Sequence, residues 1–211
     1  MSKTTIPTGG IADDAISEEH LDATAITGTT ALAATPASTD EIIISDAGTL
    51  KRLDIAHLMQ RPAFAVAKSS AQTITNNTST KITFDTEYLD TESSFASNKF
   101  TCGSGQAGNY LMRMSLLFYK NSGNYIKATE LAAYKNGGPI TYGNDLGPAN
   151  HSYISDSGDA DITQIQAVTT FLITLAENDY VECYGKAITV NSGNPSVYNY
   201  YTSWSGFKLL T

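Results

Sequence analysis

At residues 109–120 the chain reads Asn-Tyr-Leu-Met-Arg-Met-Ser-Leu-Leu-Phe-Tyr-Lys. Side chains two positions apart on a β-strand share a face, and here one face is an unbroken apolar row. That row consists of Tyr110, Met112, Met114, Leu116 and Phe118. The stretch therefore predicts a long strand with one face in a hydrophobic core.

The opposite row of this strand mixes apolar and polar side chains. It consists of Leu111, Arg113, Ser115, Leu117 and Tyr119. Such a row is too apolar for a freely solvated face and too polar for a core. We therefore expect it to meet another protein surface.

The composition is that of an all-β, turn-rich protein. Only 16% of the 211 residues are charged, whereas typical globular proteins have roughly 25%. The net charge of −8 lacks the basic footprint that nucleic-acid binding requires. No apolar run approaches the ~18 residues of a membrane span, and the N-terminus does not read as a cleavable signal peptide. We expect neither nucleic-acid binding nor membrane insertion.

Residues 1–61 differ from the rest because they contain no aromatic residue. Such a segment can hardly build a core of its own, and we expect it to extend over other surfaces. Within it, Asp46-Ala47-Gly48-Thr49 predicts the turn of a hairpin. Asp54 predicts the N-cap of a short helix ending near Gln60. The apolar anchor candidates are Ile11, Ile16, Leu21, Ile26, Ile42, Ile44 and Leu50.

Residues 62–211 predict a β-sandwich or jelly roll, because short β-prone runs alternate with turn residues. Strands are expected near 63–68, 80–85, 109–120, 125–135, 139–143, 151–155, 161–175, 179–189 and 200–210. One sheet should face water. The other, with an uncharged outer row at 161–175, should face further copies of the chain. The interface candidates are Leu111, Arg113, Leu117, Tyr119, Gln164, Gln166 and Leu172.

Several stretches of residues 62–211 resemble the C1q-like family and occur in family order. They are Ala63–Ser70, Lys81–Glu87, Phe95, Lys99–Cys102, Ala107–Tyr110, Ala132–Gly137, Leu175–Val181 and Trp204–Leu210. The resemblance implies a ten-stranded C1q/TNF-like jelly roll that forms a homotrimer. It also implies that the strands at 109–120, 161–175 and 200–210 pack around the threefold axis.

The N-terminal part has no collagen-type glycine repeat. Instead, Gly10–Ile16 and Ile44–Arg52 resemble N-terminal segments of bacteriophage fibre and related virion proteins. This resemblance implies a structural virion protein assembled in the host cytoplasm. Residues 1–61 would intertwine around the threefold axis and dock on other virion proteins, such as portal, tail, capsid or fibre components.

The two resemblances together lead to a functional expectation. The chain would be a trimeric tail or head fibre, or a spike, whose C1q-like head attaches to the host surface through a polysaccharide or a protein. One alternative is an internal tail or baseplate adaptor that joins other virion components. A polysaccharide-degrading fibre enzyme is the less favoured alternative.

Motifs of catalysis, metal binding and cofactor binding are weak in this sequence. Residues 103–108 read G-x-G-x-x-G, but a strand pattern follows where a dinucleotide site needs a helix. His20, His57 and His151 are scattered, while Cys102 and Cys183 are expected to be two buried thiols. We expect no enzyme activity and no cofactor. An acidic turn at Asp156, Asp159 and Asp161 is a calcium candidate, although an empty turn is the favoured interpretation.

Tyrosines with neighbouring polar residues are the best candidates for recognition, because tyrosine combines a large apolar face with a hydrogen-bonding end. The candidates are Tyr142, Asn144, Asp145, His151, Tyr153, Tyr198, Tyr200 and Tyr201. The alternative, that these tyrosines line the sandwich edge or a trimer seam, stays open.

Overall fold

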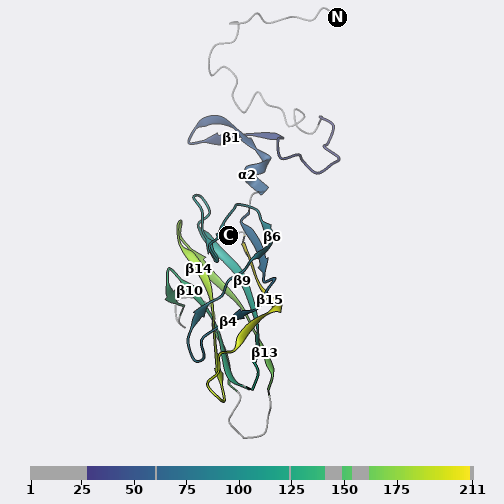
Figure 1. Ribbon diagram of the computed structural model, residues 1–211. Coiled ribbons are helices and arrows are strands. Elements are labelled where there is room, and N and C mark those ends of the chain that lie inside the picture. Colours follow the sequence, from purple (N-terminus) through teal and green to yellow (C-terminus); the bar gives the residue numbers. More distant parts are fainter. Residues whose placement is uncertain (1–27, 60, 124, 141–148, 154–161, 210–211) are drawn as a thin grey trace, which may run out of the picture. The chain divides into compact units, whose positions relative to one another are not determined.

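A computed structural model describes residues 28–59, 61–123, 125–140, 149–153 and 162–209 (Figure 1). The chain divides into two compact units, one within residues 1–59 and the other within residues 60–211. We describe each unit by itself.

The first unit contains the expected hairpin and helix. Strands β1 (Glu41–Asp46) and β2 (Thr49–Asp54) pair antiparallel, and both turn residues have positive φ, +50° at Ala47 and +83° at Gly48. Two consecutive positive φ angles are typical of the type I′ turn, whose twist matches that of a hairpin. Helix α2 (Ile55–Met59) follows, and the amides of its first two residues donate to the carbonyls of Asp40 and Ser38.

The second unit is a sandwich of two antiparallel sheets. The six-stranded sheet has the order β13 (Gln164–Leu175), β9 (Gly108–Tyr119), β15 (Ser196–Lys208), β3 (Ala63–Ala67) and β6 (Thr86–Asp90), and β4 (Gln72–Thr73) pairs with β15. The seven-stranded sheet has the order β11 (Gly138–Pro139), β10 (Ile126–Lys135), β14 (Tyr180–Thr189), β8 (Lys99–Thr101) and β7 (Phe95–Ala96), with β12 (Ala149–Tyr153) on β10 and β5 (Thr80–Lys81) on β14.

The path of the chain makes this sandwich a jelly roll. From β8 onward the long strands alternate between the sheets, so that β9, β13 and β15 lie in one and β10 and β14 in the other. This alternation is the pattern of interlocking Greek keys, and it confirms the predicted fold class. Ten strands were expected, and the described residues contain thirteen in this unit, of which β4, β5, β7 and β11 are pairings of only two residues each.

The strand expected at 80–85 is paired over its first two residues only. The amide of Ile82 donates to the carbonyl of Cys183 in one sheet, and that of Asp85 donates to the carbonyl of Ala67 in the other. The segment therefore crosses between the sheets, and it cannot form a continuous ladder in either. A further unexpected strand, β6, follows it at the edge of the six-stranded sheet.

The core lies between the sheets, and the apolar row of β9 fills its centre. Each of the five side chains of that row has no exposed surface, as the period-2 pattern predicts. Trp204 of β15 is also fully buried, with its ring 5.1 Å from Phe64, 5.4 Å from Phe95 and 5.9 Å from Phe84. Cys102 and Cys183 are buried free thiols, which confirms the expectation for both.

The glycine-rich stretch before β9 is a turn. Gly105 has a φ of +72° and its amide donates to the carboxylate of Glu177. Strand β9 then begins at Gly108. Because a strand and not a helix follows the glycines, no helix N-terminus faces a phosphate here. The strand expected after this motif is thus confirmed.

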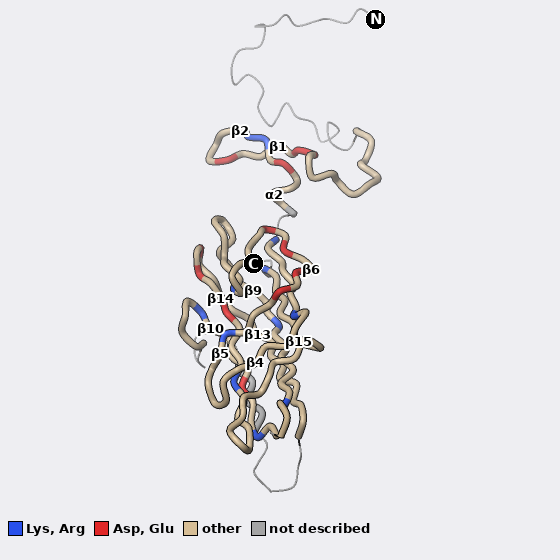
Figure 2. Tube along the Cα trace, in the orientation of Figure 1, with Lys and Arg blue, Asp and Glu red and all other residues tan. Residues whose placement is uncertain are grey.

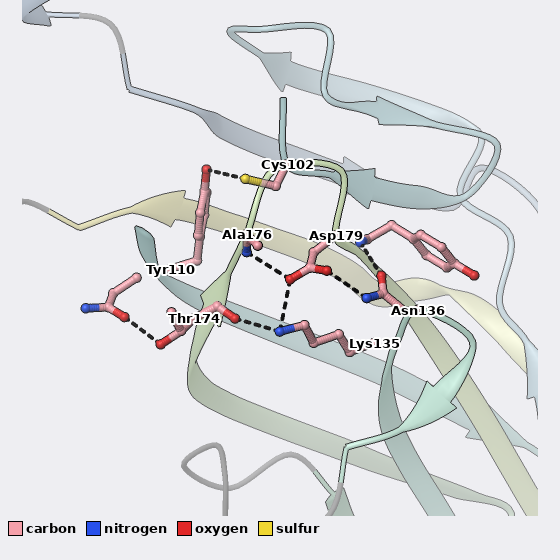
Figure 3. A network of polar contacts seen from close by, with 9 residues as sticks. Cys102, Tyr110, Lys135, Asn136, Thr174, Ala176 and Asp179 are labelled. Carbon is pink, nitrogen blue, oxygen red and sulfur yellow. Dashed lines mark hydrogen bonds and ion pairs between the residues drawn. The ribbon is translucent and has the colours of Figure 1, made fainter. Parts of the chain in front are cut away.

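Two turns at one end of the sandwich are joined by a polar network (Figure 3). The carboxylate of Asp179 accepts hydrogen bonds from the amide of Ala176 and from the side chain of Asn136, and it pairs with Lys135 at 3.1 Å. Asn136 in turn accepts from the amide of Tyr180. Figure 3 also shows that Lys135 donates to the carbonyl of Thr174. The network fixes the start of β14 against the end of β10.

Asp179→Asn is expected to lower the free energy of unfolding by about 2 kcal/mol at pH 7. The hydrogen bond from Asn136, with those from Ala176 and Lys135, lowers the pKa of Asp179. A carboxylate whose pKa is lower in the folded than in the unfolded protein stabilises the fold. This stabilisation is fully present at pH values above the unfolded-state pKa of about 3.9, and it is lost as the pH falls through the folded-state pKa. The deficit of the variant should therefore shrink below pH 4.

Urea titrations followed by the fluorescence of Trp204, the one tryptophan of the chain, measure this at pH 7 and at pH 3. Glu87→Gln, which neutralises an exposed carboxylate on β6, is the matched control and should change little at either pH. A deficit for Asp179→Asn that is equal at both pH values would contradict the assigned role of the charge.

Candidate functional site

The outer face of the six-stranded sheet is almost free of charge. Strands β13, β9, β15 and β3 contain two charged residues, Arg113 and Lys208. Lys208 is in register with the inward-facing Tyr110, so that Arg113 is the one charge in the outward-facing rows of these four strands. The rest of the face is apolar, hydroxylic or amidic. Its members include Ala63, Ala65, Leu111, Val168, Thr170, Leu172, Ser203, Ser205 and Phe207.

The seven-stranded sheet has a different surface. Its charged side chains form the ion pairs Lys81–Glu182 at 2.6 Å, Lys135–Asp179 at 3.1 Å and Lys186–Glu130 at 3.7 Å. Figure 2 shows both kinds of charge on the strands labelled β10 and β14. Charged side chains with partners of opposite sign are typical of a surface that stays in water. The two sheets thus present chemically distinct faces.

Strand β15 carries a large bulge on the uncharged face. Its register with β9 shifts between Tyr198, opposite Leu117, and Ser203, opposite Ser115. The bulge, residues 199–202, is held by two hydrogen bonds. The hydroxyl of Ser115 donates to the carbonyl of Tyr201 (2.8 Å), and the amide of Leu117 donates to the hydroxyl of Thr202 (3.1 Å).

The bulge presents aromatic side chains. Tyr200 and Tyr201 are 62% and 74% exposed. Tyr201 has a φ of +60°, which a bulky residue rarely adopts and which must be maintained by the surrounding contacts. Tyr198 lies between Tyr200 and Tyr119, with ring centroids 5.4 Å and 5.5 Å away. We call these four residues the tyrosine cluster, and it is the candidate binding site.

The bulge corrects one expectation for the interface row. Leu117 was expected to be free for contact with another copy, but it is only 7% exposed. Ser115, in the same row, is also buried and accepts a hydrogen bond from the side chain of Gln166 at 3.0 Å. Both residues lie between β13 and the bulged part of β15, so the fold of a single chain already covers them.

The other interface candidates lie on the outward-facing rows as expected. Arg113, Gln164, Gln166 and Tyr119 are exposed, while Leu111 and Leu172 are half-buried and pair with each other across β9 and β13. Whether these side chains meet another copy stays a prediction.

The remaining candidates are divided between the two sheets and the undescribed residues. His151 and Tyr153 lie on β12 in the seven-stranded sheet, away from the sheet of the tyrosine cluster. Tyr142, Asn144 and Asp145 lie outside the described residues, as do the calcium candidates Asp156, Asp159 and Asp161.

The anchor candidates fall in the first unit. Ile11, Ile16, Leu21 and Ile26 lie outside the described residues. Ile42, Ile44 and Leu50 are on the hairpin, and Leu50 is exposed there together with Ile43.

Neither cysteine of the described residues is activated as a nucleophile. Burial raises the pKa of Cys102 and of Cys183, which keeps both thiols protonated and weakly nucleophilic. The described part of the chain contains no group of three or more His, Cys, Asp or Glu side chains arranged for a metal ion. Among its helices, none is long and apolar enough to span a membrane.

Comparison with known proteins gives similarities of structure only. The sequence matches no family model and no curated protein. Among solved structures, the globular domain of zebrafish complement 1qA protein is similar at 14% identity and a TM-score of 0.48, over 71% of this chain and 98% of that one. Murine APRIL is similar at 10% identity, over 71% of this chain and all of that one, with TM-scores of 0.49 at pH 5.0 and 0.45 at pH 8.5.

The strand order described above makes the described part of residues 60–211 a jelly-roll sandwich. This is the fold that the resemblance to the C1q-like family implies, so that the expected fold is confirmed. Function must be argued from the uncharged sheet face and from the tyrosine cluster.

Proposed function

We propose that the chain is a trimeric fibre or spike protein of a bacteriophage virion, with residues 62–211 as a head that binds the host surface. The observation that carries the proposal is the contrast between the two sheets. One carries three partly buried ion pairs, whereas Arg113 is the one charge in the outward-facing rows of β13, β9, β15 and β3 in the other.

The uncharged face supports assembly from identical copies. A flat sheet face with apolar and hydroxylic side chains loses little hydration when it is covered, and its few polar groups find hydrogen-bond partners easily. Phe207 and Leu111 are paired in register on this face and form an apolar patch with Leu172. In a closed ring, three copies would bury these residues together.

The tyrosine cluster supports attachment to a surface. Adjacent exposed tyrosines give a rigid apolar platform with hydroxyl groups at its edge, the chemistry that adaptable binding sites and sugar-binding surfaces use. Three copies on one trimer would turn a weak contact into strong attachment through multivalency. The role within a virion is supported by the resemblance of Gly10–Ile16 and Ile44–Arg52 to fibre segments. The chain would act by binding, without turnover.

Replacement of Tyr200 and Tyr201 by serine is expected to reduce binding of the purified trimer to intact host cells at least tenfold, because exposed aromatic anchors dominate such contacts. Flow cytometry with the labelled protein measures the change. Tyr88→Ser is the matched control, since Tyr88 is 75% exposed on β6 outside the cluster.

The same variants separate attachment from assembly. Unchanged binding with an intact trimer would contradict the receptor role of the tyrosine cluster. Loss of the trimer itself, measured by light scattering, would place these tyrosines in the seam between copies.

Immunogold labelling of the particle tests the virion role directly. Label at a distal tip is expected. Label at an internal joint would favour the adaptor, and a particle without label would overturn the proposal.

A further inference from the structure

Arg113 is at the middle of β9 and points outward from the uncharged face. Its partners in register are Thr170 on β13 and Ser205 on β15, both with hydroxyl side chains. The outward-facing positions around it on these strands are held by Leu111, Ser115, Val168, Leu172, Ser203 and Phe207. Within the described residues no carboxylate forms an ion pair with Arg113.

What distinguishes Arg113 is the uncharged face around it. The other sheet pairs three of its lysines with carboxylates. On a single chain in water an unpaired guanidinium is well hydrated and costs nothing. Inside a seam between copies the same charge would lose its water, and an uncompensated charge in such a place is strongly destabilising.

Copies of one chain contribute identical residues where they meet on a threefold axis, whereas away from the axis each copy presents a different patch to its neighbour. The outward-facing rows of the four main strands hold no carboxylate. With Arg113 of each chain on the axis, three guanidinium groups would gather there with no acidic partner from this face. A small anion from the solution would then supply the missing negative charge.

We propose that the trimer binds one small oxyanion, of the phosphate or sulfate class, on its threefold axis through the three Arg113 side chains. This inference rests on the proposed assembly through the uncharged face. A tetrahedral oxyanion itself has threefold symmetry, and a guanidinium donates paired hydrogen bonds to its oxygens. The hydroxyls of Thr170 and Ser205 beside each arginine supply further donors.

Native mass spectrometry and thermal melts of the full chain test the proposal. The wild type is expected to be a trimer that carries one added oxyanion mass per three chains. Low-millimolar sodium phosphate or sulfate should raise its melting temperature by about 2–4 °C over sodium chloride of equal ionic strength, once the anion exceeds its Kd about a hundredfold, because one anion stabilises three chains.

Arg113→Gln is the decisive variant. It should remain a trimer, lose the added mass and lose the response to both anions, while its melting temperature in chloride rises above that of the wild type. Arg52→Gln, which removes an arginine paired with Glu41 on the hairpin, is the matched control and should keep the full anion response.

Two outcomes distinguish failure of the oxyanion site from failure of the proposed assembly. A wild-type trimer without an added mass and without an anion response, or an equal response in Arg113→Gln, overturns the oxyanion site and leaves the proposed assembly standing. A wild-type chain that is monomeric at micromolar concentration overturns the proposed assembly, and the site with it.

Discussion

Phe207→Lys is expected to convert the proposed trimer into a folded monomer. Phe207 is 46% exposed on the uncharged face and lies in register with Leu111 on one side and Ala63 on the other. A lysine there would remain in water in the single chain, so the fold should survive. In the assembly it would place three ammonium groups in the seam beside Arg113, and uncompensated buried charges cost about 3–5 kcal/mol each. The dissociation constant of the trimer should therefore rise at least a hundredfold.

Size-exclusion chromatography with light scattering measures the mass over a concentration series. The emission of the buried Trp204 reports whether each chain is folded. Val190→Lys is the control, because Val190 is 55% exposed next to β14 in the other sheet. A Phe207→Lys protein that remains trimeric would show that the uncharged face does not hold the copies together.

The parts of the fold that were predictable are those that local patterns determine. The apolar row of β9 is visible in the sequence because strand periodicity requires no knowledge of the partner strands. The turn at Ala47 and Gly48 is likewise local, since its chemistry is contained in two residues. The uncharged row of β13 can be read in the same way, and it pairs with β9 over the full length of the strand.

The bulge of β15 could not be predicted, because it depends on contacts distant in sequence. The start of this strand was expected at residue 200, whereas it begins at Ser196. The bulge is held by hydrogen bonds with Ser115 and Leu117, more than eighty positions earlier in the chain. No pattern near Tyr200 signals these bonds. For the same reason the burial of Leu117 was missed, although its place in the outward-facing row was predicted.

The polar network between the turns shows a further limit of prediction from the sequence. Asn136 and Asp179 each lie at a turn between strands, and asparagine and aspartate are common in turns for local reasons. Their mutual hydrogen bond of 2.7 Å joins turns 43 positions apart. A sequence pattern identifies the turns, but the pairing of β10 with β14 is what brings them together.

Trp204→Ala is expected to lower the free energy of unfolding by about 3–5 kcal/mol, the range for removing a large buried aromatic side chain. The indole is fully buried and meets Phe64 and Phe95 edge-on, with interplanar angles of 88° and 82°. Its removal leaves a cavity between the sheets that rigid rings on both sides cannot close. Urea titration followed by circular dichroism, at one fixed chain concentration, measures the loss.

Trp204→Phe should lower the free energy of unfolding clearly less than Trp204→Ala, because removal of the indole N–H opposes the loss of packing. The indole Nε1 is buried without a hydrogen-bond partner in the described residues, and a buried unsatisfied donor costs about 1–3 kcal/mol. Phenylalanine retains most of the ring contacts and carries no donor. Tyr88→Ala removes an exposed ring and should shift stability by less than about 0.5 kcal/mol. If Trp204→Phe and Trp204→Ala lowered the free energy of unfolding equally, the contribution of Trp204 would come from an interaction of its N–H group. Aromatic packing would then not be what stabilises the contact between the two sheets.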